Sequence, residues 1–337
     1  MPSLWDLCGT VGEPGTLLIG CRVTSCRLQV FRLQVAGFES NLFYTFAAMG
    51  NIISALLYYL VLIPISLLPF PVMYLFSDFF FVLLYYVFPY RKKLVISNLK
   101  RSFPEKSDKE IAVITKAFYK HFCDIVFETL KVFTASQIAL KKRVTLENTD
   151  ILRNFYKQGK SVIVVTGHFA NWEWPAVTLP FHSDHKGSGI YSTLSNKFFD
   201  KKLRSTRARF GTQLMSTRQV HEFFEATKNE LYTYGFINDQ SPSKPEKGHW
   251  MTFLGQDTCM LLGAEKYAML YNLPVVYGKI TKVKRGHYNL SYELVTENPS
   301  AEKPFYITEK CAQINEKLIV AQPQFWLWTH RRWKHKR

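Results

Sequence analysis

Residues 52–70, IISALLYYLVLIPISLLPF, contain no charged side chain. As a helix this segment would be roughly 28 Å long, close to the hydrocarbon thickness of a bilayer. A second apolar segment, residues 71–90, carries one acidic residue, Asp78. The alternative, two buried core helices, would require other elements to cover large apolar side chains on every side. We therefore expect a membrane-anchor helix at 52–70, and an interfacial or domain-packed segment at 71–90.

The segments that flank these helices differ in composition. Tyr90 to Lys93 reads YRKK, and a basic cluster beside an apolar segment favours a cytoplasmic flank. Residues 1–48 hold three of the six cysteines and show no clear helical or strand periodicity. We expect them to be a non-native or disordered extension, with Met49 as the working start; the alternative is an ordered N-terminal arm. Three parts follow: the extension 1–48, the anchor and interfacial region 49–90, and a main domain 91–337.

Charge and composition narrow the class of partner. The formal net charge of +17 favours an acidic partner, and 15% aromatic residues favour a lipid surface. Nucleic acid would also be an acidic partner, but the sequence contains no nucleic-acid-binding motif. The cysteines form no C-x-x-C pair, so we expect neither a disulfide nor a metal site, and the main domain suits a reducing compartment.

The main domain alternates predicted helices and strands. Ser107 and Glu110 form a capping box that predicts a helix start. Four consecutive apolar residues in SVIVVT predict a strand buried on both faces. Predicted core strands also cover LYTYGFIND and LPVVYGKI, and NLSYELV is predicted as an edge strand. The pattern indicates an α/β fold with a mixed, mostly parallel sheet flanked by helices.

His168 follows the buried strand directly, and Glu173 comes five residues later in GHFANWEW. Loops beyond the carboxyl ends of parallel strands are where such sheets place their chemistry. If His168 lies in the loop and a helix starts near Ala170 or Asn171, the chain can bring the imidazole to Glu173. A carboxylate on one imidazole nitrogen raises the basicity of the other, which makes a general base for a hydroxyl. The alternative is a helix-capping histidine and a glutamate in an ion pair.

The chain lacks a G-x-S-x-G elbow, so no serine or cysteine is placed to carry a covalent intermediate. Direct attack by a bound alcohol on an activated acyl group is the chemistry that the pattern favours.

The box GHFANWEW resembles the H-x4-D/E motif of the glycerolipid acyltransferases. It is most similar to the late acyltransferases of bacterial lipid A biosynthesis, the lauroyl and myristoyl transferase family. Further segments resemble this family in the same order from about residue 49 to 337. They are YRKKLVISNLKRSFPEKSDKE, RARFGTQL, NDQSPSKPEKGHWMTFLGQ and QPQFWLWTHRRWK.

The resemblance implies a glycerol-phosphate-acyltransferase-like fold, with residues 91–337 as the acyltransferase domain. It implies that His168 is the general base and that Glu173 orients it. Arg207, with Arg209, would hold phosphate or the developing oxyanion, and Asp239 would lie in a strand-end loop on the side of the active site. No metal or organic cofactor is implied.

Asn171 is expected to line or support the site and counts among the candidate substrate-binding residues. The alternative role of Asp239 is to form a turn. The alternative for Arg207 and Arg209 is that they lie on the solvated face of a helix. Trp326 and Trp328, next to Arg331, Arg332 and Lys334, suit either a membrane interface or the core.

The resemblance further implies an acyl carrier protein thioester as donor, a hydroxyl of a lipid A precursor or other anionic lipid as acceptor, and an apolar tunnel for the donor chain. It places the protein at the bacterial inner (cytoplasmic) membrane, with the catalytic domain on the cytoplasmic face. One alternative keeps the chemistry and changes the acceptor to an aminolipid, lysophospholipid or glycolipid. Another is a non-catalytic scaffold that binds anionic lipid.

Overall fold

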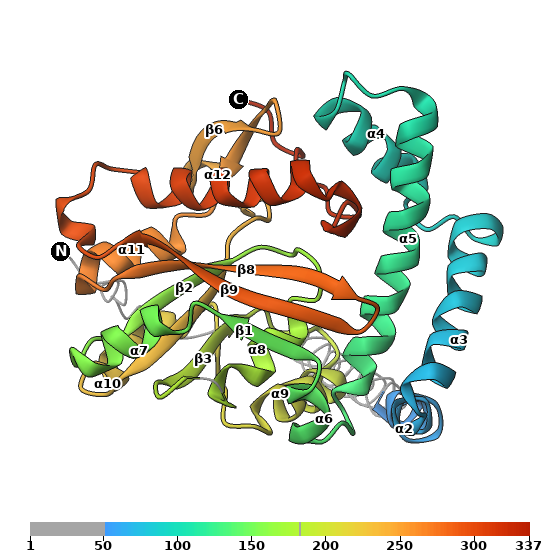
Figure 1. Cartoon of the computed structure of the whole chain (residues 1–337), viewed down its shortest axis with the longest axis horizontal. Coiled ribbons are helices and arrows are strands. Elements are labelled where there is room, and N and C mark those ends of the chain that lie inside the picture. Colours follow the sequence, from blue (N-terminus) through green and yellow to red (C-terminus); the bar gives the residue numbers. More distant parts are fainter. Residues whose placement is uncertain (1–50, 182) are drawn as a thin grey trace, which may run out of the picture. The chain divides into compact units, whose positions relative to one another are not determined.

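The chain alternates strands and helices around a central sheet, as Figure 1 shows. The computed structural model describes residues 51–181 and 183–337. The predicted extension 1–48, including its boundary at Met49, lies outside the described residues. Within the described part, Ser54–Arg337 form one compact unit.

Seven strands form the main sheet in the order β1-β9-β8-β2-β5-β3-β4, and β6 and β7 form a separate hairpin. The strands are β1 (Val144–Glu147), β2 (Val162–Thr166), β3 (Lys186–Tyr191), β4 (Gln213–Ser216), β5 (Tyr232–Ile237), β6 (His249–Phe253), β7 (Gln256–Met260), β8 (Val275–Lys284) and β9 (His287–Thr296). β8, β2, β5, β3 and β4 run parallel, whereas β9 is antiparallel to β8 and parallel to β1. The predicted mostly parallel α/β sheet is confirmed. The expectation that NLSYELV is an edge strand is wrong, because β1 pairs with the outer side of β9.

The helices surround this sheet and extend it at one end. They are α2 (Ile63–Leu67), α3 (Phe70–Val82), α4 (Lys92–Ser102), α5 (Asp108–Lys131), α6 (Gln137–Lys141), α7 (Asp150–Lys157), α8 (Glu173–Thr178), α9 (Lys197–Ala208), α10 (Val220–Thr227), α11 (Gly263–Tyr271) and α12 (Tyr306–Ala321). Short π-helical turns are η1 (Tyr58–Leu62) and η2 (Leu83–Val87), and 3-10 turns are η3 (Leu179–Phe181), η4 (Pro245–Lys247), η5 (Pro299–Ala301) and η6 (Pro323–Phe325). The predicted capping box at Ser107 and Glu110 is present at the start of α5.

β2 shows why a doubly covered strand is apolar throughout. Ile163 and Val165 pack in one core cluster with residues of α10, α11 and α12. Val162 and Val164 point to the other face, into a cluster with residues of α7 and α8. The strand is therefore fixed from both faces, and the residue that follows it is held at a defined place.

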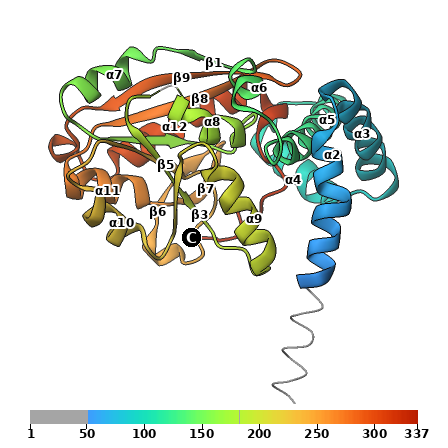
Figure 2. The same ribbon diagram turned by 90° about the horizontal axis from the view of Figure 1, so that it is seen from below.

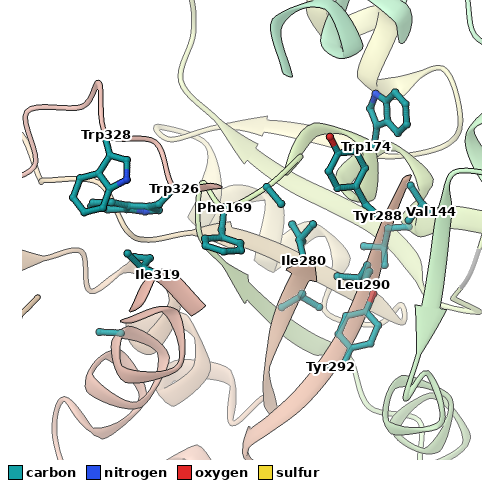
Figure 3. Packing of buried hydrophobic residues seen from close by; sticks show 14 of the residues in the cluster. Val144, Phe169, Trp174, Ile280, Tyr288, Leu290, Tyr292, Ile319, Trp326 and Trp328 are labelled. Atoms are coloured by element: carbon teal, nitrogen blue, oxygen red, sulfur yellow. The ribbon is translucent and has the colours of Figure 1, made fainter. Parts of the chain in front are cut away.

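The C-terminal tryptophans belong to the core. Trp326 and Trp328 are buried, and their rings meet edge to face with centroids 4.7 Å apart. Figure 3 shows them beside Phe169, the residue after His168. The prediction that these tryptophans lie at a membrane interface is therefore wrong, and the alternative, that they pack in the core, is confirmed.

The two apolar segments form helices separated at Leu68 and Pro69. By length and composition, Phe70–Val87 is the helix among the described residues that could cross a bilayer, and Asn51–Leu67 is apolar but shorter. Asn51 is the first described residue, so the expected membrane anchor at 52–70 stays a prediction. Figure 2 shows α2, α3 and α5 grouped at one end of the sheet.

Candidate functional site

His168 lies just beyond the carboxyl end of β2, and Asp239 lies just beyond the end of β5. These strands are parallel neighbours, so their ends meet at one edge of the sheet. The Nδ1 atom of His168 is 2.6 Å from Oδ1 of Asp239, and the backbone N–H of His168 donates to Oδ2 over 2.8 Å. The carboxylate thus fixes the ring and assigns the proton to Nδ1, which leaves Nε2 as the unprotonated nitrogen.

Glu173 does not fill the place expected for it on the imidazole. Its carboxylate accepts from Nη2 of Arg207 at 2.6 Å and from Nε at 3.0 Å, a two-point ion pair between α8 and α9. Asp239 occupies Nδ1 instead, so the expected pairing of His168 with Glu173 is corrected. The reason is topological: the end of a neighbouring strand lies closer to the imidazole than a carboxylate that starts the next helix. Asp239 is correspondingly a partner of His168 rather than a substrate-binding group.

The Asp239 carboxylate is buried and accepts a third hydrogen bond, from Nε1 of Trp326 at 2.7 Å. Burial by itself raises the pKa of Asp239. The charge of His168, with the hydrogen bonds from His168 and Trp326, outweighs burial and holds that pKa below its usual value. Asp239 is therefore ionised at neutral pH.

The C-terminal segment, residues 325–330, ties the two site loops together. Leu327 donates its backbone N–H to the carbonyl of His168, and the N–H of Ser241 donates to Nε2 of His330. Burial lowers the pKa of His330 to about 4, which suits a neutral ring that accepts this bond. His330 thus supports the Asp239 loop.

A cavity of about 630 Å³ opens beside this pair. Its polar lining includes His168, Glu173 and Arg207, together with Asp200, Arg204 and Gln240. Apolar side chains line much of the remainder, namely Val164, Leu179, Ile190, Leu214, Val220, Ile280 and Leu290. Gly189 and Gly235 lie opposite each other on β3 and β5 and also line it. The absence of side chains at these two positions leaves space over the sheet.

Two expected site residues do not line the cavity. Arg209 donates to the backbone carbonyls of Phe133 and Ala135, so it braces a loop and does not line the cavity. Asn171 is buried, and its Oδ1 accepts from the backbone N–H groups of Glu173 and Trp174 at the start of α8. Asn171 thus supports the site from behind.

Sequence reasoning missed Gln240, whose Nε2 lies 3.2 Å from Nε2 of His168 and which lines the cavity. Its position next to Asp239 was the available signal. Within residues 51–181 and 183–337, no group of three or more His, Cys, Asp or Glu side chains is arranged to hold a metal ion.

Comparison with known proteins identifies the family. The model of the family described as "Bacterial lipid A biosynthesis acyltransferase" matches residues 44–335. A curated relative from Haemophilus influenzae, named "Lipid A biosynthesis acyltransferase", is 24% identical over 248 residues, which is 72% of this chain and 78% of the relative. The chain belongs to the bacterial lipid A biosynthesis acyltransferase family, and is accordingly an acyltransferase of lipid A biosynthesis.

Proposed function

We propose that the chain transfers a fatty acyl group from an acyl carrier protein thioester to a hydroxyl of a lipid A precursor, with His168 as general base. The observation that carries this proposal is the 2.6 Å contact between Nδ1 of His168 and the buried Asp239 carboxylate, at the wall of a largely apolar cavity. A neutral imidazole held in this tautomer presents Nε2 to a bound alcohol.

The reaction follows from this arrangement. Nε2 of His168 takes the hydroxyl proton as the oxygen attacks the thioester carbonyl carbon. The tetrahedral intermediate collapses, the carbon–sulfur bond breaks, and the imidazolium returns its proton to the departing thiolate. The negative charge of Asp239 stabilises the imidazolium between these steps. The apolar part of the cavity suits the acyl chain.

Arg207 and Glu173 contribute as a pair. Glu173 engages Nε and Nη2 of the guanidinium, so Nη1 is the group that would meet a phosphate or the developing oxyanion. In this assignment Glu173 orients Arg207, while Asp239 orients His168.

The test uses purified full-length protein with acyl carrier protein thioesters of graded chain length and a panel of acceptors, read by mass spectrometry. The panel contains a lipid A precursor, a lysophospholipid, an aminolipid and a glycolipid. We expect acylation of the lipid A precursor. Acylation of another acceptor alone would overturn the assigned substrate, and no transfer to any acceptor would overturn the donor or the activity.

His168→Ala should lower kcat by about 10³-fold or more, because the general base is lost. The matched control is His249→Ala, since His249 also pairs with a carboxylate, Glu309, at 2.8 Å but does not line the cavity. We expect near wild-type turnover from the control. Comparable turnover for both variants would sink the mechanism.

We propose further that the outer face of α3 attaches the domain to the cytoplasmic side of the bacterial inner membrane. Five exposed residues at helical spacing form this outer apolar face: Val72, Leu75, Phe76, Phe79 and Val82. The opposite side of α3 packs on the domain: Met73 and Ser77 are buried, Ser77 donates to Asp124, and Asp78 pairs with Arg285. Because α3 lies against α5, a helix crossing the bilayer would draw α5 and its exposed Lys116 and Lys120 into hydrocarbon. The arrangement favours a helix lying in the plane of the interface.

Nitroxide labels at Val72, Leu75, Phe79 and Tyr86 test this orientation by paramagnetic depth measurement in vesicles of anionic phospholipid. A helix in the membrane plane gives similar depths at all four positions. A spanning helix places residues 72 and 86 roughly 21 Å apart along the membrane normal, so the label at Phe79 would be deep and those at Val72 and Tyr86 shallow, and that result would contradict the proposal. A label at Lys120 on α5 serves as the control and should report water.

A further inference from the structure

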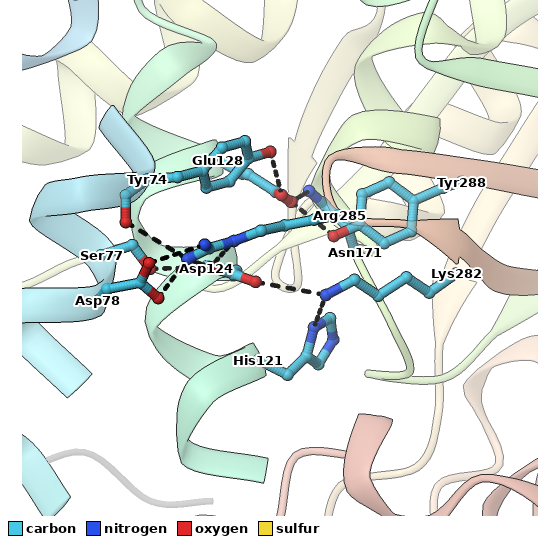
Figure 4. Close-up of polar contacts among 10 residues, drawn as sticks. All are labelled: Tyr74, Ser77, Asp78, His121, Asp124, Glu128, Asn171, Lys282, Arg285 and Tyr288. Atoms are coloured by element: carbon cyan, nitrogen blue, oxygen red, sulfur yellow. Dashed lines mark hydrogen bonds and ion pairs between the residues drawn. The ribbon is translucent and has the colours of Figure 1, made fainter. Parts of the chain in front are cut away.

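Glu128 of α5 is a fully buried carboxylate outside the cavity, and it touches the site segment twice. Its Oε2 accepts from Nδ2 of Asn171 at 2.6 Å, and its backbone carbonyl accepts from Nε1 of Trp174 at 2.9 Å. Figure 4 shows the Glu128 side chain between Tyr74, Asn171 and Tyr288. The hydroxyl groups of Tyr74 and Tyr288 supply its other side-chain donors, at 2.8 and 2.7 Å.

Asn171 carries this contact to the site. While its Nδ2 is held by Glu128, its Oδ1 accepts from the N–H groups of Glu173 and Trp174, each at 3.1 Å. An amide has one acceptor and one donor end, and only one rotamer orientation satisfies both. The Glu128 carboxylate therefore decides which end of Asn171 faces α8.

α8 begins at Glu173, the residue that engages Arg207 in the cavity wall. A flipped or displaced Asn171 would present N–H groups to the N–H groups of α8 and move the helix start. The Glu173–Arg207 pair would move with it, and small displacements of positioning groups are costly in catalysis.

We propose that Glu128 is a positioning residue for acyl transfer, acting through Asn171 to hold the start of α8 and the Glu173–Arg207 pair in place. The proposal rests on the proposed function, because it concerns the turnover of that same site. It assigns Glu128 no contact with substrate.

An exchange of donor and acceptor tests the contact directly. Asn171→Asp places a second carboxyl group against Glu128, and at a pH high enough to remove the proton that the two groups share it should lower kcat/KM roughly tenfold or more. The double variant Asn171→Asp with Glu128→Gln restores a donor and an acceptor with reversed polarity. One N–H of the new Gln amide donates to the new carboxylate, and its other N–H faces the Tyr288 hydroxyl. The second oxygen of the new carboxylate still caps α8. We expect recovery to within about threefold of wild type.

Two further readouts separate positioning from general stability. The activity of Asn171→Asp relative to wild type should recover as the pH falls, because two close carboxyl groups can share a proton. Hydrogen exchange of the peptide that contains residues 172–178 should rise in Asn171→Asp and return to the wild-type rate in the double variant. This second readout needs no turnover, so the failure of the contact can be told apart from failure of the proposed function.

Tyr288→Phe is the matched control, since it removes the other donor to Oε2 and leaves Asn171 untouched. Tyr288→Phe should lose about as much thermal stability as Asn171→Asp, but its kcat/KM should stay close to the wild-type value. Equal losses of activity in Tyr288→Phe and Asn171→Asp would overturn the proposal. The proposal would also be overturned if the double variant unfolds at the wild-type temperature but keeps the hydrogen-exchange rate and the kcat/KM of Asn171→Asp.

Discussion

Two buried carboxylates, Asp239 and Glu128, lie on either side of the site segment and differ in what they are bonded to. Asp239 accepts from the N–H and Nδ1 of His168 and from Nε1 of Trp326. Glu128 accepts from two hydroxyl groups and an amide, all neutral. Each carboxylate therefore has three hydrogen bonds to its oxygens, but only Asp239 has a donor that can become a cation.

Because of this difference, the pKa values of the two carboxylates shift in opposite directions. Burial favours the neutral form of both. At Asp239, the His168 charge and the hydrogen bonds overcome burial, so the pKa is lowered. At Glu128, burial dominates and raises the pKa to about 6, with the bonds from Tyr288 and Tyr74 offsetting part of the rise. At Glu128 the hydrogen bonds from the two tyrosines do not offset burial, whereas at Asp239 the charge of His168 and the hydrogen bonds together do.

The comparison assigns the two carboxylates different tasks. Asp239 must be ionised to hold the imidazole tautomer and to stabilise an imidazolium. Glu128 must accept a hydrogen bond from Asn171, which a carbonyl oxygen also does.

The largest expected effect comes from making the same isosteric change at both positions. In Asp239→Asn, the amide oxygen satisfies the donors His168 N–H and Trp326 Nε1, so the NH₂ group faces Nδ1. The imidazole proton then moves to Nε2, and the base is lost. We expect kcat at neutral pH to fall about 10³-fold or more. Steady-state turnover with the donor and acceptor preferred by the wild type measures it.

Glu128→Gln is the counterpart in that experiment. Its amide oxygen still accepts from Asn171 and Tyr288, and its NH₂ group faces the Tyr74 hydroxyl, so the loss should stay below about threefold. Losses of similar size in the two variants would remove the distinction between a charge-dependent and a charge-independent carboxylate.

The sequence predicted the elements of the fold more fully than the partners within the site. The apolar run of β2, the capping box at Ser107 and the place of His168 beyond a parallel strand follow from local pattern. The pairing of His168 with Asp239 does not, because 71 residues separate them and only the order of strands brings them together. Local spacing favoured Glu173, the nearest carboxylate along the chain.

The supporting groups were hidden for a related reason. Glu128 lies on the helix whose start the capping box predicts, and that signal does not indicate that this carboxylate faces inward. Its donors come from α3, β9 and the site loop, three elements far apart in sequence. A buried polar cluster assembled from such distant parts has no local signature.

A smaller effect on stability sharpens the comparison. Glu128 has a pKa of about 6 when folded, against an ordinary value of 4.5. Between these values the native state binds the proton more tightly than the unfolded state, so its stabilisation is complete below pH 4.5 and is lost as the pH rises through 6. The total is about 2 kcal/mol, since one pKa unit corresponds to about 1.4 kcal/mol. Glu128→Gln lacks this dependence. Its melting temperature relative to wild type should therefore rise by roughly 4 °C between pH 4.5 and 7.

Asp239 should behave in the opposite sense in the same measurement. Its folded pKa lies below 3.8, so its contribution to stability is present above that pH and is lost only as the pH falls further. Below pH 3.8 the wild type loses this contribution and the variant does not, so the melting temperature of Asp239→Asn relative to wild type should rise as the pH falls further. Thermal unfolding of both variants in detergent at several pH values tests the pair together. No rise of the Asp239→Asn difference below pH 3.8, or a constant Glu128→Gln difference between pH 4.5 and 7, would show that the neighbouring cation does not set the ionisation of these two groups.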